Sequence, residues 1–278
     1  MATIEYSLFR AKFIKPKQSL LFDPGLSPSE ILLSAIQDRP SAEIRAGYVW
    51  HIGNIQPFTK TMGYFAVGRT TNATIEKFDS QSKNFVVEEL ETSPYTHVVY
   101  DASIGILGIA KKASLAPTSK GIASKIELLF GQTHNVLKNE ITVEVRPIPD
   151  PDGFLKAVAA AYRVSRFTAS FRGPNPVDAD ALFQKPLAVY CSKVGGEKGK
   201  VQVQGTDLDR EVVQEVARSS AATGNEASAR IFKSASQKPI TVSMSGDPIK
   251  KKYDEDTHDT KKVLHDMTSL YQKVRSND

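Results

Sequence analysis

A glycine- and lysine-rich segment is the first place where this sequence could do chemistry. Residues 195–200 read Gly-Gly-Glu-Lys-Gly-Lys, so the backbone could approach a phosphate closely, with Lys198 and Lys200 beside it. The segment lacks the Gly-Lys-Ser/Thr ending of a nucleotide-binding loop and leads into a strand pattern rather than a helix. It therefore predicts either contact with a nucleic-acid backbone or an ordinary solvated hairpin loop.

A second basic feature lies on an alternating segment, residues 164–172. Because strand side chains alternate between faces, Arg166 and Arg172 share one face with two hydroxyl residues, and Phe167 and Phe171 share the other. We expect the phenylalanine face to be buried and the arginine face to be accessible. Such a face could hold nucleic acid, although it lacks the aromatic residues that stack on bases.

A third basic cluster, residues 250–252, is Lys-Lys-Lys. Acidic residues follow it at once, which favours a partly neutralised linker to the last helix. We nevertheless include it in the predicted nucleic-acid-binding set, which comprises Arg166, Arg172, Lys198, Lys200, Lys250, Lys251 and Lys252.

Histidine and cysteine spacings indicate no metal site and no nucleophile. None of the five histidines pairs with another at the i, i+4 spacing of a zinc-binding helix. His258 and His265 lie among aspartates and a glutamate, but such residues near a helix start are typical of capping. Cys191 has no histidine near it in the sequence and is predicted to be a buried structural residue. We expect no metal and no cofactor.

Nuclease chemistry would require carboxylates that converge on a divalent cation. Asp101 ends one predicted strand, and Glu140 and Glu144 begin another, but no Asp…Glu-X-Lys arrangement on neighbouring strands is clear. Catalytic residues therefore stay unassigned, and it is uncertain whether the protein is an enzyme.

Composition is that of an ordinary globular protein of 278 residues, with 40% hydrophobic and 24% charged residues. The net charge of +5 permits a polyanionic partner without requiring one. A single cysteine favours a reducing compartment. No apolar run approaches the ~18 residues of a membrane span, and the first residues do not resemble a leader, so we expect a cytoplasmic protein.

The first half of the chain predicts a strand over residues 3–15, apolar on both faces, and a helix over 30–38 capped by Ser27. Residues 44–52, 63–69, 73–78 and 84–91 have strand patterns, which suggests an antiparallel meander.

Residues 95–176 predict a ferredoxin-like ββαβαβ segment. Its strands are expected at 95–100, 103–111, 142–146 and 164–172, and its helices at 118–130 and 154–162. Pro174-Asn175-Pro176 marks the predicted boundary between an N-terminal domain, 1–175, and a smaller α/β domain, 176–278.

The C-terminal part predicts helices at 178–191, 207–222, with Thr206 as the cap, and 257–275, and strands at 200–204, 227–233 and 240–245. The last helix carries an apolar stripe that includes Val263, Met267, Leu270 and Val274, which we expect to dock on its own domain.

Three segments resemble a family of uncharacterised bacterial proteins that are discussed alongside phage-defence genes. They are residues 104–109, 166–176 and 222–225, and the resemblance extends over about half of the chain. It implies a role in bacterial antiviral defence and transfers no active-site residue.

We expect an α+β fold dominated by antiparallel sheet. The leading functional hypothesis is a nucleic-acid-binding component of a bacterial defence or regulatory system, directed at the backbone and not sequence-specific. The alternatives are a metal-dependent nuclease in the same setting and a protein–protein adaptor without nucleic-acid contact; a partner protein or homo-oligomer is compatible with each.

Overall fold

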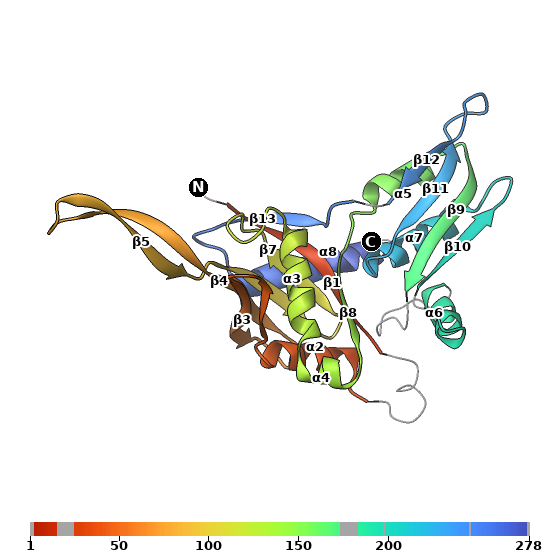
Figure 1. The fold of residues 1–278 in the computed structure, drawn as a ribbon. Coiled ribbons are helices and arrows are strands. Elements are labelled where there is room, and N and C mark those ends of the chain that lie inside the picture. The colour runs from red at the N-terminus through yellow and green to blue at the C-terminus, as the bar shows by residue number, and fades with distance from the viewer. Residues whose placement is uncertain (1–2, 16–24, 173–182, 197, 245, 277–278) are drawn as a thin grey trace.

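The protein is a mixed α+β structure in which the strands form two antiparallel sheets (Figure 1). The computed structural model describes residues 3–15, 25–172, 183–196, 198–244 and 246–276. The predicted α+β class with mostly antiparallel strands is confirmed. Within the described residues, every helix is too short or too polar to cross a lipid bilayer.

The first sheet has the order β13–β1–β7–β6–β4–β3–β2, with β8 beside β1 and β5 beside β4. Its strands are β1 (Thr3–Ile14), β2 (Ser41–Arg45), β3 (Tyr48–Pro57), β4 (Met62–Asp79), β5 (Asn84–Thr92), β6 (Tyr95–Asp101), β7 (Ile106–Ala110), β8 (Thr142–Pro147) and β13 (Lys250–Asp254). Residues 44–52, predicted as a single strand, are divided between β2 and β3 by a turn in which Gly47 has a φ of +75°.

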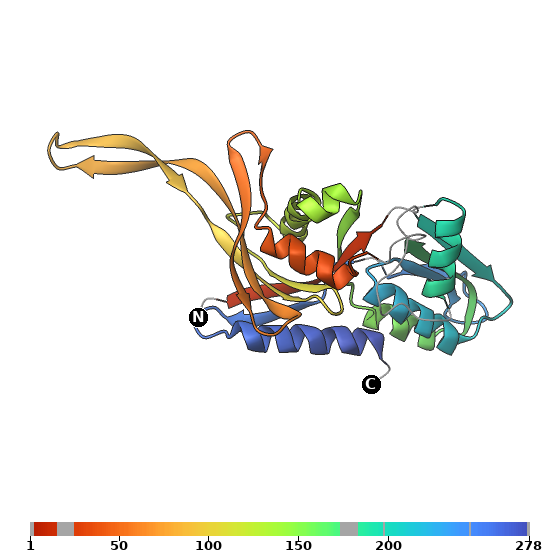
Figure 2. The ribbon, with the colours of Figure 1, turned by 90° about the horizontal axis from the view of Figure 1, so that it is seen from below.

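Strand β1 lies inside this sheet because both of its faces are apolar, as predicted. Tyr6 and Leu8 belong to one buried cluster, and Phe9 and Phe13 belong to another. Helices α2 (Pro28–Gln37), α3 (Ser119–Gly131) and α4 (His134–Lys138) cover the second face, and α8 (Thr260–Arg275) covers the first (Figure 2). The predicted cap of α2 by Ser27 is confirmed, and it is a capping box, since Ser27 and Glu30 exchange hydrogen bonds.

Strand β4 continues far beyond the sheet. Its first half pairs with β3 and β6, and its second half pairs only with β5. The β4–β5 hairpin, residues 71–92, projects from the body, away from the second sheet (Figures 1 and 2). We call this hairpin the arm.

The second sheet has the order β10–β9–β11–β12. Its strands are β9 (Arg163–Arg172), β10 (Lys198–Gln204), β11 (Ala227–Phe232) and β12 (Ile240–Ser243), and its helices are α5 (Asp152–Ala159), α6 (Gln184–Lys193) and α7 (Arg210–Ala222). Phe167, Ala169 and Phe171 are buried, as predicted, but the opposite face is only partly accessible, since Thr168 is buried and Arg166 is half-buried. Asp209, rather than Thr206, caps α7.

The path of the chain between the sheets differs from the predicted one. Strands β6, β7 and β8 lie in the first sheet and β9 lies in the second, so these elements do not share one sheet and the ferredoxin-like arrangement is not confirmed. Beyond the predicted boundary at residue 175, β13 and α8 return to the first sheet. The periodicity of β8 and β9 shows that both are strands, but it carries no information about which strand each one pairs with.

Helix α8 joins the two parts. Val263, Met267 and Val274 are buried and Leu270 is partly buried, so the predicted docking on the protein's own core is confirmed. The helix packs on β6 and β7 of the first sheet and also against α7 of the second part. It begins at Thr260 because Asp259 accepts a hydrogen bond from the backbone of Lys261.

Candidate nucleic-acid interface

A groove separates β8 of the first sheet from the near end of the second sheet. It encloses about 620 Å³. One wall comes from β8, the other from β9 and β10, and the loop after α7 completes it. The lining residues are Glu144, Arg146, Ser170, Phe171, Lys198, Gly199, Lys200, Gly224, Asn225 and Glu226.

Two further hollows continue the groove and share lining residues with it. One encloses about 190 Å³ and follows the polar face of the second sheet past Thr168 and Ser228. The other encloses about 460 Å³ and combines Pro147, Pro149 and Met244 with two cationic residues; we call it the proline hollow. Its remaining lining residues are Lys120, Arg146, Gly224, Asn225, Glu226 and Gly246. All three spaces meet at Glu226.

Lys198 and Lys200 give the groove most of its accessible positive charge. Both are exposed, and no ion pair holds either of them among the described residues. Arg146 lies 3.6 Å from Glu144, which is itself buried. Glu226 is exposed, so one carboxylate lies in the groove beside these cations.

The second sheet itself is free of acidic residues. Strands β9 to β12 contain no aspartate and no glutamate, whereas they contain six lysines and arginines. The register places Lys200 opposite Ser170 and Arg166 opposite both Gln204 and Arg230, so these side chains share the polar face. Arg166 is half-buried at the far end of this face and does not line the groove. The backbone of Arg172 pairs with Lys198, and the Arg172 side chain lies outside the described residues.

Gly199 is a glycine for a packing reason. A Cβ atom at this position would lie 2.2 Å from the ring of Phe171, the residue paired with it on β9. The ring thus occupies the space that a side chain would need, and β10 keeps its two lysines on either side of it. From the sequence we expected this glycine to admit a phosphate. The structure shows that a glycine is required here because the Phe171 ring fills the space.

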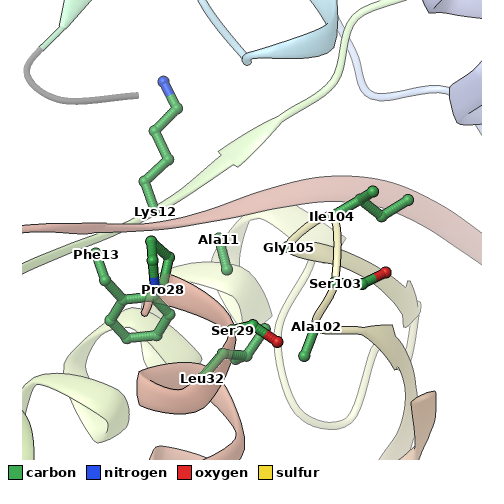
Figure 3. Close-up of a pocket in the computed structure, with 10 residues that line it drawn as sticks. All are labelled: Ala11, Lys12, Phe13, Pro28, Ser29, Leu32, Ala102, Ser103, Ile104 and Gly105. Carbon is green, nitrogen blue, oxygen red and sulfur yellow. The ribbon is translucent and has the colours of Figure 1, made fainter. Parts of the chain in front are cut away.

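A buried polar network fixes the groove between the sheets. The Lys12 ammonium donates a hydrogen bond to Asn225 Oδ1 at 3.2 Å, and the Asn225 amide donates to Thr223 and Gln184. Lys12 lies four residues after Leu8 on β1, so both side chains are on the same face of the strand. That face packs against the second part of the molecule. Figure 3 shows Lys12 directed away from the other residues around it. Together with Lys12, those residues line a separate cavity of about 20 Å³, which has room for about one water molecule.

The lysines of residues 250–252 lie on β13, not in the linker that the sequence suggested. Lys250 and Lys120 both contact Asp247, so Lys250 lies just beyond the proline hollow. Hydrogen bonding to Lys120 and its charge hold the pKa of Asp247 below its usual range. Lys251 pairs with Asp266 at 2.8 Å, and Lys252 is exposed opposite Glu5. The fold therefore brings Lys198 and Lys200 together but holds Lys251 and Lys252 apart from them.

Two histidines form a pair that the sequence did not suggest. The rings of His97 and His258 lie 5.5 Å apart, and Tyr95 stacks on His97. Tyr6 lies 3.3 Å from His258 Nε2, and burial raises the pKa of this tyrosine, so its O–H is kept and can donate. Burial, and secondarily the nearby His258, lowers the pKa of His97. The two histidines are 161 positions apart in the sequence, and only the return of β13 and α8 brings them together.

Metal ligation finds no support in the part of the chain that the structure describes. No group of three or more histidine, cysteine, aspartate or glutamate side chains gathers there to hold a metal ion. Cys191 is buried, as predicted. The acidic residues near His258 act locally, since Asp259 caps α8 and Asp254 accepts a backbone hydrogen bond from Asp256.

Comparisons with known proteins add no functional assignment. No protein-family model matches the chain, and no curated protein matches it in sequence.

Proposed function

We propose that the groove and the polar face of the second sheet bind the phosphate backbone of nucleic acid without sequence specificity. The observation that supports this most is the charge of the second sheet, whose strands hold six basic residues and no acidic ones. A polyanion laid on this face would meet Lys198 and Lys200 at one end and Arg166 and Arg230 at the other.

The shape of the site also favours backbone contact over base reading. The groove is open and lined by flexible lysines, which recognise phosphate as point charges. Side chains on the polar face of β9 and β10 are serine, threonine, glutamine, lysine and arginine, so no aromatic ring on these strands is available there for stacking on bases. Contacts of this kind position a nucleic acid but do not specify its sequence.

The biological setting of the proposal is bacterial antiviral defence or regulation in the cytoplasm. The resemblance of residues 104–109, 166–176 and 222–225 motivates it. Residues 223–225 belong to the loop that forms the edge of the groove, so part of this resemblance falls at the proposed site.

Fluorescence anisotropy tests the proposal directly. Labelled single- and double-stranded DNA and RNA, each of two unrelated sequences, are titrated at low salt. We expect binding whose affinity is equal for the two sequences of each type and falls steeply when salt is added. Absence of binding to all four types at low salt would refute the proposal and favour the protein–protein adaptor.

A further inference from the structure

The arm exposes more apolar surface than its own structure can explain. Ile75, Phe78, Phe85, Val87 and Leu90 are all exposed, with 83% of Phe85 and 54% of Phe78 accessible. Beyond residue 70, β4 pairs only with β5, so the arm is a two-stranded ribbon, which is marginally stable alone in water. Exposed apolar surface of this kind marks an interaction site.

The register gives one face of the arm a distinct composition. Phe78 is paired with Phe85, and their rings contact edge to face with centroids 5.4 Å apart. Glu76 is paired with Val87, and Glu89 and Glu91 continue the same face toward the body. This face therefore presents an aromatic tip followed by three carboxylates.

Charge identifies a suitable partner. Five acidic and two basic residues give the arm, residues 71–92, a net charge of −3. Subtracting this from the +5 of the whole chain leaves +8 on the rest of the molecule. The arm is thus complementary in charge to the body of the chain that carries it. It projects away from the second sheet (Figures 1 and 2), so the complementary surface has to come from another molecule.

The proline hollow has the features that such an arm requires. Pro147, Pro149 and Met244 provide apolar walls for an aromatic side chain, and the hollow encloses about 460 Å³. Arg146 and Lys120 also line it, and the carboxylates behind an inserted ring would meet them in place of Glu144 and Asp247, with which they now pair. We propose that the arm of one copy inserts its phenylalanine tip into the proline hollow of a second copy.

The arm and the proline hollow are two different surfaces, so one arm–hollow contact leaves a second arm and a second hollow free on every pair. These two either join each other, which closes a symmetric dimer, or join further copies, which gives a ring or an open chain. This inference goes beyond nucleic-acid binding and does not require it, since arm and hollow associate as protein alone.

Analytical ultracentrifugation of nuclease-treated protein over a concentration series tests the inference. Two variants are needed: an arm variant, Phe78→Ser with Phe85→Ser, and a hollow variant, Lys120→Glu with Arg146→Glu. The control is Leu137→Ser, which removes an apolar side chain, 61% exposed, from α4. Circular dichroism and thermal melting establish that all three are folded.

We expect the wild type and the control to associate into dimers or larger assemblies as concentration rises. Each variant alone should self-associate about 30-fold more weakly, as for loss of an interface hot spot. A mixture of the two variants should form dimers and stop there, because one intact arm and one intact hollow remain between them.

Three results would overturn the inference. They are a wild type that stays monomeric at every concentration, an arm variant that associates like the wild type, and a mixture of the two variants that stays monomeric. Self-association by the hollow variant but not by the arm variant would show that arms bind to each other, which would also exclude the proline hollow as the receptor.

Discussion

Replacing Lys198 and Lys200 by alanine is the most direct test of the groove. If Arg166, Arg230 and these two lysines, the cations that a polyanion on the polar face would meet, each neutralise one phosphate of duplex DNA, the slope of log affinity against log salt is about −3.6. Affinity should then fall about 150-fold between 50 and 200 mM salt. Removing the two lysines halves the number of contacts, so the slope becomes about −1.8 and the fall about 12-fold.

The measurement is anisotropy of a labelled duplex at several salt concentrations. The matched control is Lys60→Ala with Lys111→Ala, which removes the same charge from two exposed loop positions that line none of the three hollows. We expect the control to keep the steep slope. A slope that is unchanged in the groove variant, or equally reduced in the control, would show that binding follows net charge and does not use the groove.

Four further outcomes follow from the same structure. Phe171→Ala should lower the free energy of unfolding by about 3–5 kcal/mol because the ring is buried across β10, and a melting shift no larger than that of a surface variant would contradict this. Asn225→Ala removes a buried acceptor from Lys12 and should cost about 1.5–3 kcal/mol in a chemical denaturation curve. Glu226→Gln should tighten nucleic-acid binding, measured by anisotropy, because it removes the exposed carboxylate at which all three hollows meet. The pKa of His97 is lowered in the folded state, so below the ordinary histidine pKa of 6.5 the unfolded state binds more protons than the folded state. The melting temperature should therefore fall from pH 7 to pH 5, and it should fall less in His97→Gln.

Local structure was largely readable from the sequence because local chemistry determines it. The Ser27 capping box, the alternation around Phe167 and the apolar stripe of α8 each depend on residues within a few positions of one another. The structure confirms the cap, the stripe and the burial of the phenylalanine face, whereas the opposite face is only partly accessible because Thr168 is buried and Arg166 is half-buried.

Strand pairing was not readable because it depends on distant partners. The periodicity of β8 and β9 is the same whether they share a sheet or not, and the chain places them in different ones. Lys250 to Lys252 were interpreted as a linker. Three lysines have no strand pattern of their own, and the sequence does not show that the edge of β1 is open for them to pair with. For the same reason Lys198 and Lys200 were identified as candidates, but Arg146, which faces them from another sheet, was not.

Strands β8 and β13 lie end to end along one edge of β1, and a single bridge between Pro149 and Pro248 joins them. The chain therefore leaves the first sheet and re-enters it at almost the same place. In topological terms residues 150–247 are an insertion whose two ends are adjacent, so one unit enters and leaves the host chain at a single point. A gene shortened by linking residue 149 to residue 248 would keep all strands of the first sheet in order. Its product would carry the arm without the second sheet's wall of the groove, and it would expose the side of α8 that packs on α7.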